Sequence, residues 1–151
     1  MIADSVQENK QMITSIDPNA KIFIWSDMFD PYQFNLDNFF AVNGSINGSY
    51  KGLSDDITVV NWNFGPNYKA SLQFFENNGN PQILAGYYDG SCMPIDQWLD
   101  SARPAVRVDG VMYTTWKGDY SNLEEFAMQA WGDNNTINAS YKPTSVIEQK
   151  L

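Results

Sequence analysis

The sequence contains no histidine, a single cysteine and few basic residues, and each shortage excludes a class of site. Without histidine the chain lacks the commonest general base and metal ligand of proteins, and every triad built on an imidazole is excluded. The lone Cys92 cannot form a disulfide within the chain or a cysteine-cluster zinc site. Because no base is present to activate it, we interpret Cys92 as a small loop residue. No phosphate-binding glycine loop or nicotinamide fingerprint is present either, so we expect neither metal nor cofactor.

Basic residues are outnumbered by acidic ones, 9 against 18, which gives a net charge of −9. The acidic residues are scattered along the chain, and this distribution is typical of a solvated surface. We therefore do not expect nucleic acid as a partner. No apolar run approaches the length of a membrane span, and Met1 does not lead into a signal peptide, so we expect no membrane partner and the localisation stays open.

The hydrophobic pattern predicts one α/β domain over residues 1–132 and a polar, partly ordered tail over residues 133–151. Of the 151 residues, 43% are hydrophobic and 15% aromatic, which is enough to build a core. A helix is predicted over residues 2–16, with Ile2, Val6, Ile13 and Ile16 on one face. Strands are predicted over residues 21–27, 56–63, 82–88 and 111–115. The first is nearly continuously apolar, which predicts burial on both of its faces.

A helix follows each of the last three predicted strands. The first of these helices begins after Gly65-Pro66 and ends at Asn78-Gly79. The second is opened by Pro94 and carries apolar residues at the i, i+3, i+4 and i+7 positions, namely Ile95, Trp98, Leu99 and Ala102. For the last helix we predict Ser121 as the N-cap in a capping box with Glu124, and Gly132 as a left-handed residue that ends it.

Alternation of strands and helices predicts right-handed crossovers and a parallel sheet. Each strand ends, at its carboxyl side, in a cluster of aromatic and polar residues, and the carboxyl edge is where α/β barrels and open sheets bind ligands. Taken singly, a tryptophan is more often a core residue and a loop aspartate more often a turn residue. Their joint placement favours one shared site, composed of Trp25, Asp27, Trp62, Asn63, Tyr87, Asp89, Trp116, Asp119 and Tyr120.

The residue types of this candidate site favour a carbohydrate ligand. Aromatic faces stack on the C–H-rich faces of sugar rings, and carboxylates and amides form hydrogen bonds with hydroxyl groups.

Four segments together resemble the last four strands of the barrel in family 20 glycoside hydrolases, the β-N-acetylhexosaminidases and their relatives. They are WSDMFD at 25–30, VVNW at 59–62, YYD at 87–89 and WKGDY at 116–120. The resemblance implies half of a TIM barrel, with four βα units that correspond to strands five to eight. It further implies that Trp62 walls an acetamido pocket, that Tyr87 and Asp89 bind the acetamido group and a hydroxyl, and that Trp116 is a sugar platform. Asp119 lies one residue further from its tryptophan than the family pattern has its acidic residue.

The family's catalytic Asp-Glu pair, which acts with the acetamido group of the substrate, lies at the end of strand four and has no counterpart here. The resemblance therefore implies a sugar-binding half barrel that is inactive alone. Such a half leaves two open edges, so we expect a homodimer or a missing amino-terminal half as its partner. Two alternatives stay open: a complete small hydrolase with Asp27, Asp89 or Asp119 as catalytic carboxylates, and a non-catalytic carbohydrate-binding or structural module.

Overall fold

The computed structural model describes residues 2–33, 37–38, 43–90, 94–103 and 106–132. Cys92 and the predicted tail at 133–151 lie outside the described residues. Four α-helices, one 3-10 helix and four strands occupy the described part in the order α1 (Ile2–Ile16), β1 (Phe23–Trp25), η2 (Ser49–Gly52), β2 (Thr58–Asn61), α2 (Tyr68–Asn77), β3 (Gln82–Tyr87), α3 (Ile95–Ala102), β4 (Val108–Thr114) and α4 (Leu123–Trp131). No helix in these ranges is both long and apolar enough to cross a membrane.

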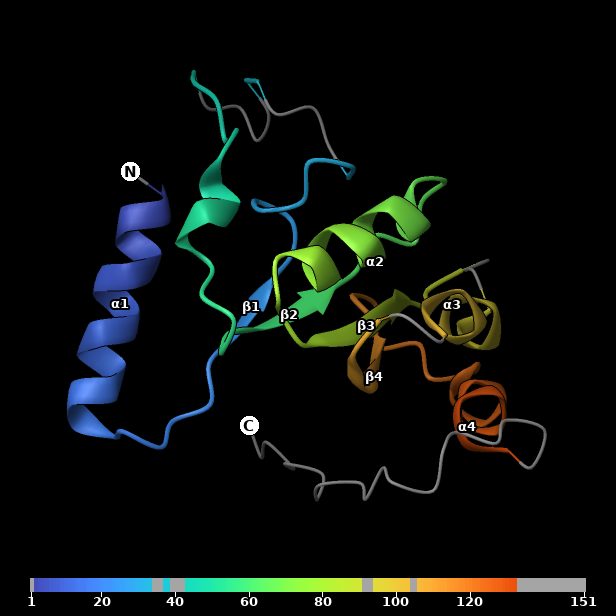
Figure 1. The fold of residues 1–151 in the computed structure, drawn as a ribbon. Helices are drawn as coiled ribbons and strands as arrows, with labels where there is room; N and C mark the ends of the chain where they lie inside the picture. Colours follow the sequence, from blue (N-terminus) through green and yellow to red (C-terminus); the bar gives the residue numbers. More distant parts are fainter. Residues whose placement is uncertain (1, 34–36, 39–42, 91–93, 104–105, 133–151) are drawn as a thin grey trace.

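The strands form one sheet in sequence order, β1-β2-β3-β4, and every neighbouring pair is parallel. The predicted α/β fold with four parallel strands is therefore confirmed (Figure 1). Pairing continues beyond β1, because the Ser26 N–H donates to the Val60 carbonyl over 3.0 Å. At the other side of the sheet, Tyr87 lies opposite Thr114. The carboxyl ends of all four strands consequently meet at one edge.

Helices α2, α3 and α4 pack on a single face of this sheet (Figure 1). Their shared core joins Leu72 of α2, Trp98 of α3 and Phe126 of α4 to Leu84 of β3. All four apolar positions predicted for α3 are buried, which confirms its helical pattern. Gly86 cannot be replaced without strain, because a Cβ there would overlap the ring of Tyr88.

The opposite face of the sheet carries no described helix. Residues that pair across the strands point to the same side, so Phe23 and Trp25 of β1 share this open face with Val60, Ile83, Ala85, Tyr87 and Met112. Val60 and Ala85 are nevertheless buried, so the exposure is greatest on β1. Phe23 is 51% exposed and Trp25 is 47% exposed. The prediction that the first strand is buried on both faces is therefore wrong, because the described helices cover the sheet from one side alone.

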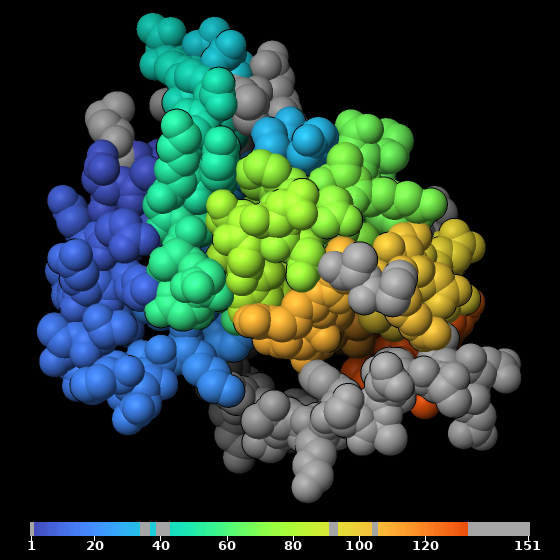
Figure 2. Space-filling view, viewed as in Figure 1, coloured from blue at the N-terminus to red at the C-terminus, as the bar shows by residue number. Residues whose placement is uncertain are grey.

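Helix α1 packs beside the segment that contains η2, as Figure 2 shows at its left. Lys10 bridges the two by hydrogen bonds to Ser54 over 2.7 Å and to Asp56 over 2.6 Å. Ile2 and Val6 of α1 pack against a second cluster of buried residues, which consists of Phe29, Leu53, Ile57, Val59 and Phe75. Ile13 is 41% exposed and Ile16 is 83% exposed, so only the first half of the predicted apolar face is covered.

Buried amide side chains connect β2, α2 and β3. The Asn61 amide donates to the Ser71 hydroxyl over 2.9 Å and to the Gln82 side-chain oxygen over 3.0 Å, and Gln82 in turn donates to the Leu72 carbonyl. All of these side chains are fully buried, where an unpaired polar group would be costly. The sequence did not predict this network, because its residues come from three separate elements.

The capping prediction for the last helix is wrong. Helix α4 begins at Leu123 with Asn122 as its N-cap, and Gly132 has an extended conformation with φ −66° instead of a left-handed one. Ser121 is held outside the helix because its N–H donates to the Asp119 carboxylate over 2.9 Å. The Asn122 amide donates to the Tyr88 carbonyl, which fixes the start of α4 against the sheet.

Candidate functional site

Aromatic rings form a continuous row across the carboxyl ends of β1, β2 and β3. Trp25 contacts Trp62 edge to face, with 6.3 Å between ring centroids, and Trp62 contacts Phe64 at 5.9 Å. Phe64 then stacks on Tyr87 at 6.2 Å with an interplanar angle of 20°. We call Trp25, Trp62, Phe64 and Tyr87 the aromatic row. Three of the four were predicted; Phe64 was missed, although its spacing of two residues from Trp62 could have indicated it.

Asp27 follows β1 directly and lies half-buried beside this row. Burial raises the pKa of its carboxyl above the ordinary value, against the opposing effects of a backbone hydrogen bond and of Trp62. The buried indole N–H of Trp62 has no partner of good hydrogen-bond geometry in the described residues, yet it lies close enough to favour the Asp27 anion. Asp27 is thus a carboxyl group that binds its proton more tightly than an exposed one.

The raised pKa predicts how Asp27→Asn changes stability with pH. Because the pKa is higher in the folded state than in the unfolded state, protonation of Asp27 stabilises the fold. This stabilisation is fully present below pH 3.8, the ordinary pKa, and it is lost as the pH rises through the pKa of the folded state. At about pH 7 the ionised carboxylate therefore costs stability, and the Asn variant should be more stable than the wild type. Urea unfolding at about pH 7 and about pH 3 measures the difference, which should vanish at the lower pH.

The exposed Asp109 supplies the matched control. Asp109→Asn removes one negative charge at the opposite end of the sheet, together with an exposed ion pair to Arg107 at 3.8 Å, a kind of pair that contributes little to stability. This control separates the local effect from the general benefit of a smaller net charge. Equal gains in the two Asn variants would contradict the assignment of a desolvated Asp27.

Asp89 lies at the end of β3 and is occupied by hydrogen bonds from the β4-α4 loop. Its carboxylate accepts from the Thr115 hydroxyl and from the backbone N–H groups of Trp116 and Lys117, the last over 2.9 Å. The Tyr87 hydroxyl also lies close enough to favour the Asp89 anion. Desolvation alone would raise the pKa of Asp89, but these hydrogen bonds outweigh it and hold the pKa below the ordinary value. Thr115 was not predicted as part of the site.

The loop between β4 and α4 is folded on itself around Asp119. The Asp119 N–H donates to the Thr115 hydroxyl over 2.9 Å, and the Asp119 carbonyl accepts from the Tyr113 hydroxyl. Hydrogen bonds from Ser121 lower the pKa of Asp119. Gly118 adopts φ 71°, the left-handed conformation that glycine tolerates, and completes the turn. Trp116 is left 80% exposed at the tip.

Two predicted site residues point away from the aromatic row. Asn63 is 3% exposed, and its amide donates to the fully buried carboxyl of Asp30 over 2.9 Å. Tyr120 stacks on Tyr113 at 6.2 Å, and Tyr113 belongs to the core on the helical face. The structure therefore brings together four of the predicted site residues, Trp25, Asp27, Trp62 and Tyr87. Trp116 is connected to this group through its backbone hydrogen bond to Asp89. Asn63 lies in the interior instead.

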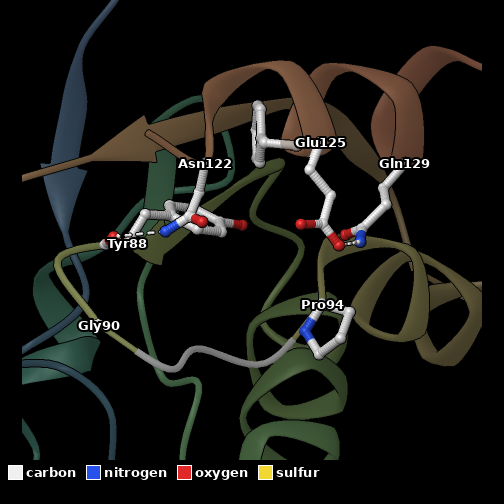
Figure 3. Close-up of a pocket in the computed structure, with 7 residues that line it drawn as sticks. Tyr88, Gly90, Pro94, Asn122, Glu125 and Gln129 are labelled. Atoms are coloured by element: carbon white, nitrogen blue, oxygen red, sulfur yellow. Dashed lines mark hydrogen bonds between the residues drawn. The ribbon is translucent and has the colours of Figure 1, made fainter. Parts of the chain in front are cut away.

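A separate hollow lies on the helical side, between α4 and the segment after β3 (Figure 3). Glu125 and Gln129 point into it together from α4, and the Gln129 amide donates to the Glu125 carboxylate over 3.0 Å. The Gln129 side-chain oxygen accepts from the Ile95 N–H at the start of α3. These polar groups serve the junction of α3 and α4, away from the strand ends.

In the described ranges, no three His, Cys, Asp or Glu side chains come close enough to hold a metal ion. Comparisons of the chain with protein-family models, with curated proteins and with solved structures find no match. The geometry of the site itself must therefore support any function.

Proposed function

We propose that this chain is the carbohydrate-binding half of a glycoside hydrolase barrel, similar to the carboxyl-terminal half of family 20 enzymes. The aromatic row would form the floor of a sugar site, with Asp27 as a hydrogen-bond partner for hydroxyl or acetamido groups. The catalytic acid and base would come from another half of the barrel. The observation that carries this proposal is the row of four touching rings across three strand ends.

Several features of the row support sugar binding. Trp25 offers a half-exposed ring face, and Trp116 offers a nearly free one across the sheet edge. Exposed aromatic rings are energetically unfavourable in water, so their concentration at the ligand edge of a parallel sheet favours a binding role. The acetamido group of an N-acetylhexosamine would add a methyl group to pack on the partly exposed ring of Trp62.

The arrangement of the sheet supports the half-barrel part of the proposal. Four parallel strands in sequence order with helices on one face are the repeating unit of a closed (β/α) barrel. In a doubly wound sheet the second face would carry helices as well. Four further parallel strands, from a second copy or from an amino-terminal half, would cover the open face and complete the rim of the site.

Sugar binding is tested by titrating the protein with N-acetylglucosamine and glucose while following tryptophan fluorescence. Trp25→Ala should weaken binding about two- to tenfold, because it removes one stacking surface from the row. Trp131→Ala is the matched control, since Trp131 is comparably exposed, at 57% against 47% for Trp25, but lies at the end of α4. Absence of any saturable response to either sugar, or equal losses in both variants, would contradict the proposal.

A complete small hydrolase is the second candidate, and the opposite pKa directions of Asp27 and Asp89 favour it. Carboxyl groups whose pKa values are displaced in opposite directions can serve as proton donor and stabilising anion. However, the Asp89 carboxylate is already engaged by three donors of the β4-α4 loop. Turnover of an aryl glycoside by the isolated chain, abolished by Asp27→Asn, would favour this alternative over the binding half.

A further inference from the structure

Asp89 links two parts of the candidate site that come from different loops. Its carboxylate accepts three hydrogen bonds, all from the β4-α4 loop: one from the Thr115 hydroxyl and two from the backbone N–H groups of Trp116 and Lys117. Asp89 itself follows Tyr87 of the aromatic row by two residues. A carboxylate has about four acceptor positions in total. The loop therefore occupies most of the positions through which Asp89 could bind a ligand.

We propose that Asp89 is a positioning residue, which fixes the β4-α4 loop against Tyr87 and thereby sets where the Trp116 ring stands relative to the aromatic row. This proposal rests on the proposed sugar site, and it assigns Asp89 a different role from the hydroxyl ligand that the family resemblance implied. Trp116 would be the residue that contacts the sugar, and Asp89 would act through it.

The backbone contacts make this assignment specific. Trp116 and Lys117 present two consecutive backbone N–H groups to one oxygen of Asp89, while Thr115 binds the other oxygen. The Thr115 hydroxyl also accepts a hydrogen bond from the Asp119 N–H, so it connects the two ends of the turn over residues 115–119. Without the carboxylate, two backbone N–H groups at the base of the loop would lose their acceptor. Little else restrains Trp116, whose ring is 80% exposed.

The electrostatics are consistent with a carboxylate held as an anion. Burial, together with the charge and the closeness of the Asp89 carboxylate, raises the pKa of Tyr87, which keeps the phenol protonated. The lowered pKa of Asp89 contributes stability that is present above the ordinary value and is lost as the pH falls through the folded-state value. The loop should therefore stay fixed throughout the neutral range.

The test compares Asp89→Asn, Trp116→Ala and the double variant in the full chain, with Asp109→Asn as the control for charge removal. Amide hydrogen exchange, followed by NMR, reports on the loop without any sugar. In Asp89→Asn the amides of Trp116 and Lys117 should exchange at least about tenfold faster than in the wild type, because they lose a charged acceptor. In Asp109→Asn they should exchange at the wild-type rate. Unchanged exchange in Asp89→Asn would overturn the proposal.

Titration with N-acetylglucosamine then separates a positioning role from direct contact. If Asp89 acts through Trp116, the double variant binds no more weakly than Trp116→Ala alone, since the two losses are not independent. If the fold-losses of sugar affinity in the two single variants multiply in the double variant, Asp89 contacts the sugar itself. That result would overturn the assignment. If the wild type binds no sugar, the proposed function fails while the exchange result still decides the role of Asp89 in the loop.

Thr115→Val provides a second variant in case Asp89→Asn does not fold. It keeps the carboxylate and removes one donor to it, together with the acceptor of the Asp119 N–H. Faster exchange of the Asp119 amide, with a smaller increase at Trp116, is expected. No change at either amide would overturn the proposed arrangement.

Discussion

Trp98→Ala should lower the free energy of unfolding by about 3 to 5 kcal/mol, the usual cost of removing a large buried aromatic side chain. Trp98 has no exposed surface and stands at the centre of the core shared by α2, α3, α4 and β3. Removing its indole leaves a cavity that the rigid sheet cannot fill. Because a domain has only about 5 to 15 kcal/mol of total stability, this variant would be close to unfolding at room temperature.

Trp116→Ala is the matched control for this experiment, because its ring is 80% exposed. It should change stability by no more than about 0.5 kcal/mol. Urea unfolding, with the midpoint and the slope both fitted, measures the two values. Should Trp98→Ala fail to fold, Trp98→Phe, which removes less volume, should show a smaller loss in the same direction. Similar midpoints for the Trp98 and Trp116 variants would contradict the described core.

The purified chain should associate with copies of itself through the open face of the sheet. Phe23 and Trp25 are about half exposed there, and the outer edges of β1 and β4 have no strand beside them in the described residues. We expect a second copy of the chain to cover these groups. A twofold axis parallel to the strands would place β4 of one copy beside β1 of the other, with all strands parallel.

Phe23→Glu should convert this assembly to monomers, because it puts a charge into the covered face. Light scattering coupled to size-exclusion chromatography should give at least twice the 17.1 kDa chain mass for the wild type and the chain mass for the variant. Ile16→Glu is the control: Ile16 is an apolar residue with 83% exposure, but it lies on α1 and away from the sheet. A wild-type chain that stays monomeric at high concentration would contradict the half-barrel proposal.

Local patterns in the sequence were sufficient to predict the sheet and helix α3. The spacing of Ile95, Trp98 and Leu99 fixes one face of a helix regardless of its surroundings, and these residues are buried as expected. The four strands likewise follow from apolar segments separated by helical ones. Burial of β1 on both faces was predicted wrongly, because a single strand cannot reveal how many layers cover its sheet.

The sequence predicted that aromatic residues of the candidate site lie together, but it did not predict the contacts of each residue. Trp25, Trp62 and Tyr87 do meet at the strand ends, since parallel strands bring their carboxyl ends to one edge. In contrast, the burial of Asn63 against Asp30 depends on the path of the chain after β1. The same holds for Ser121, whose N–H binds Asp119 and leaves the N-cap to Asn122. Such contacts join segments that no local pattern connects.

The spacing between the strands also sets the length that a ligand needs in order to span the carboxyl edge of the sheet. Neighbouring strands are about 4.8 Å apart, so the axes of β1 and β4 are separated by roughly 14 Å. Trp25 is the last residue of β1, and Trp116 follows the end of β4 by two residues. A molecule that stacks on both rings at once must therefore extend over more than one pyranose ring, so a short oligosaccharide matches the length of this edge better than a monosaccharide does.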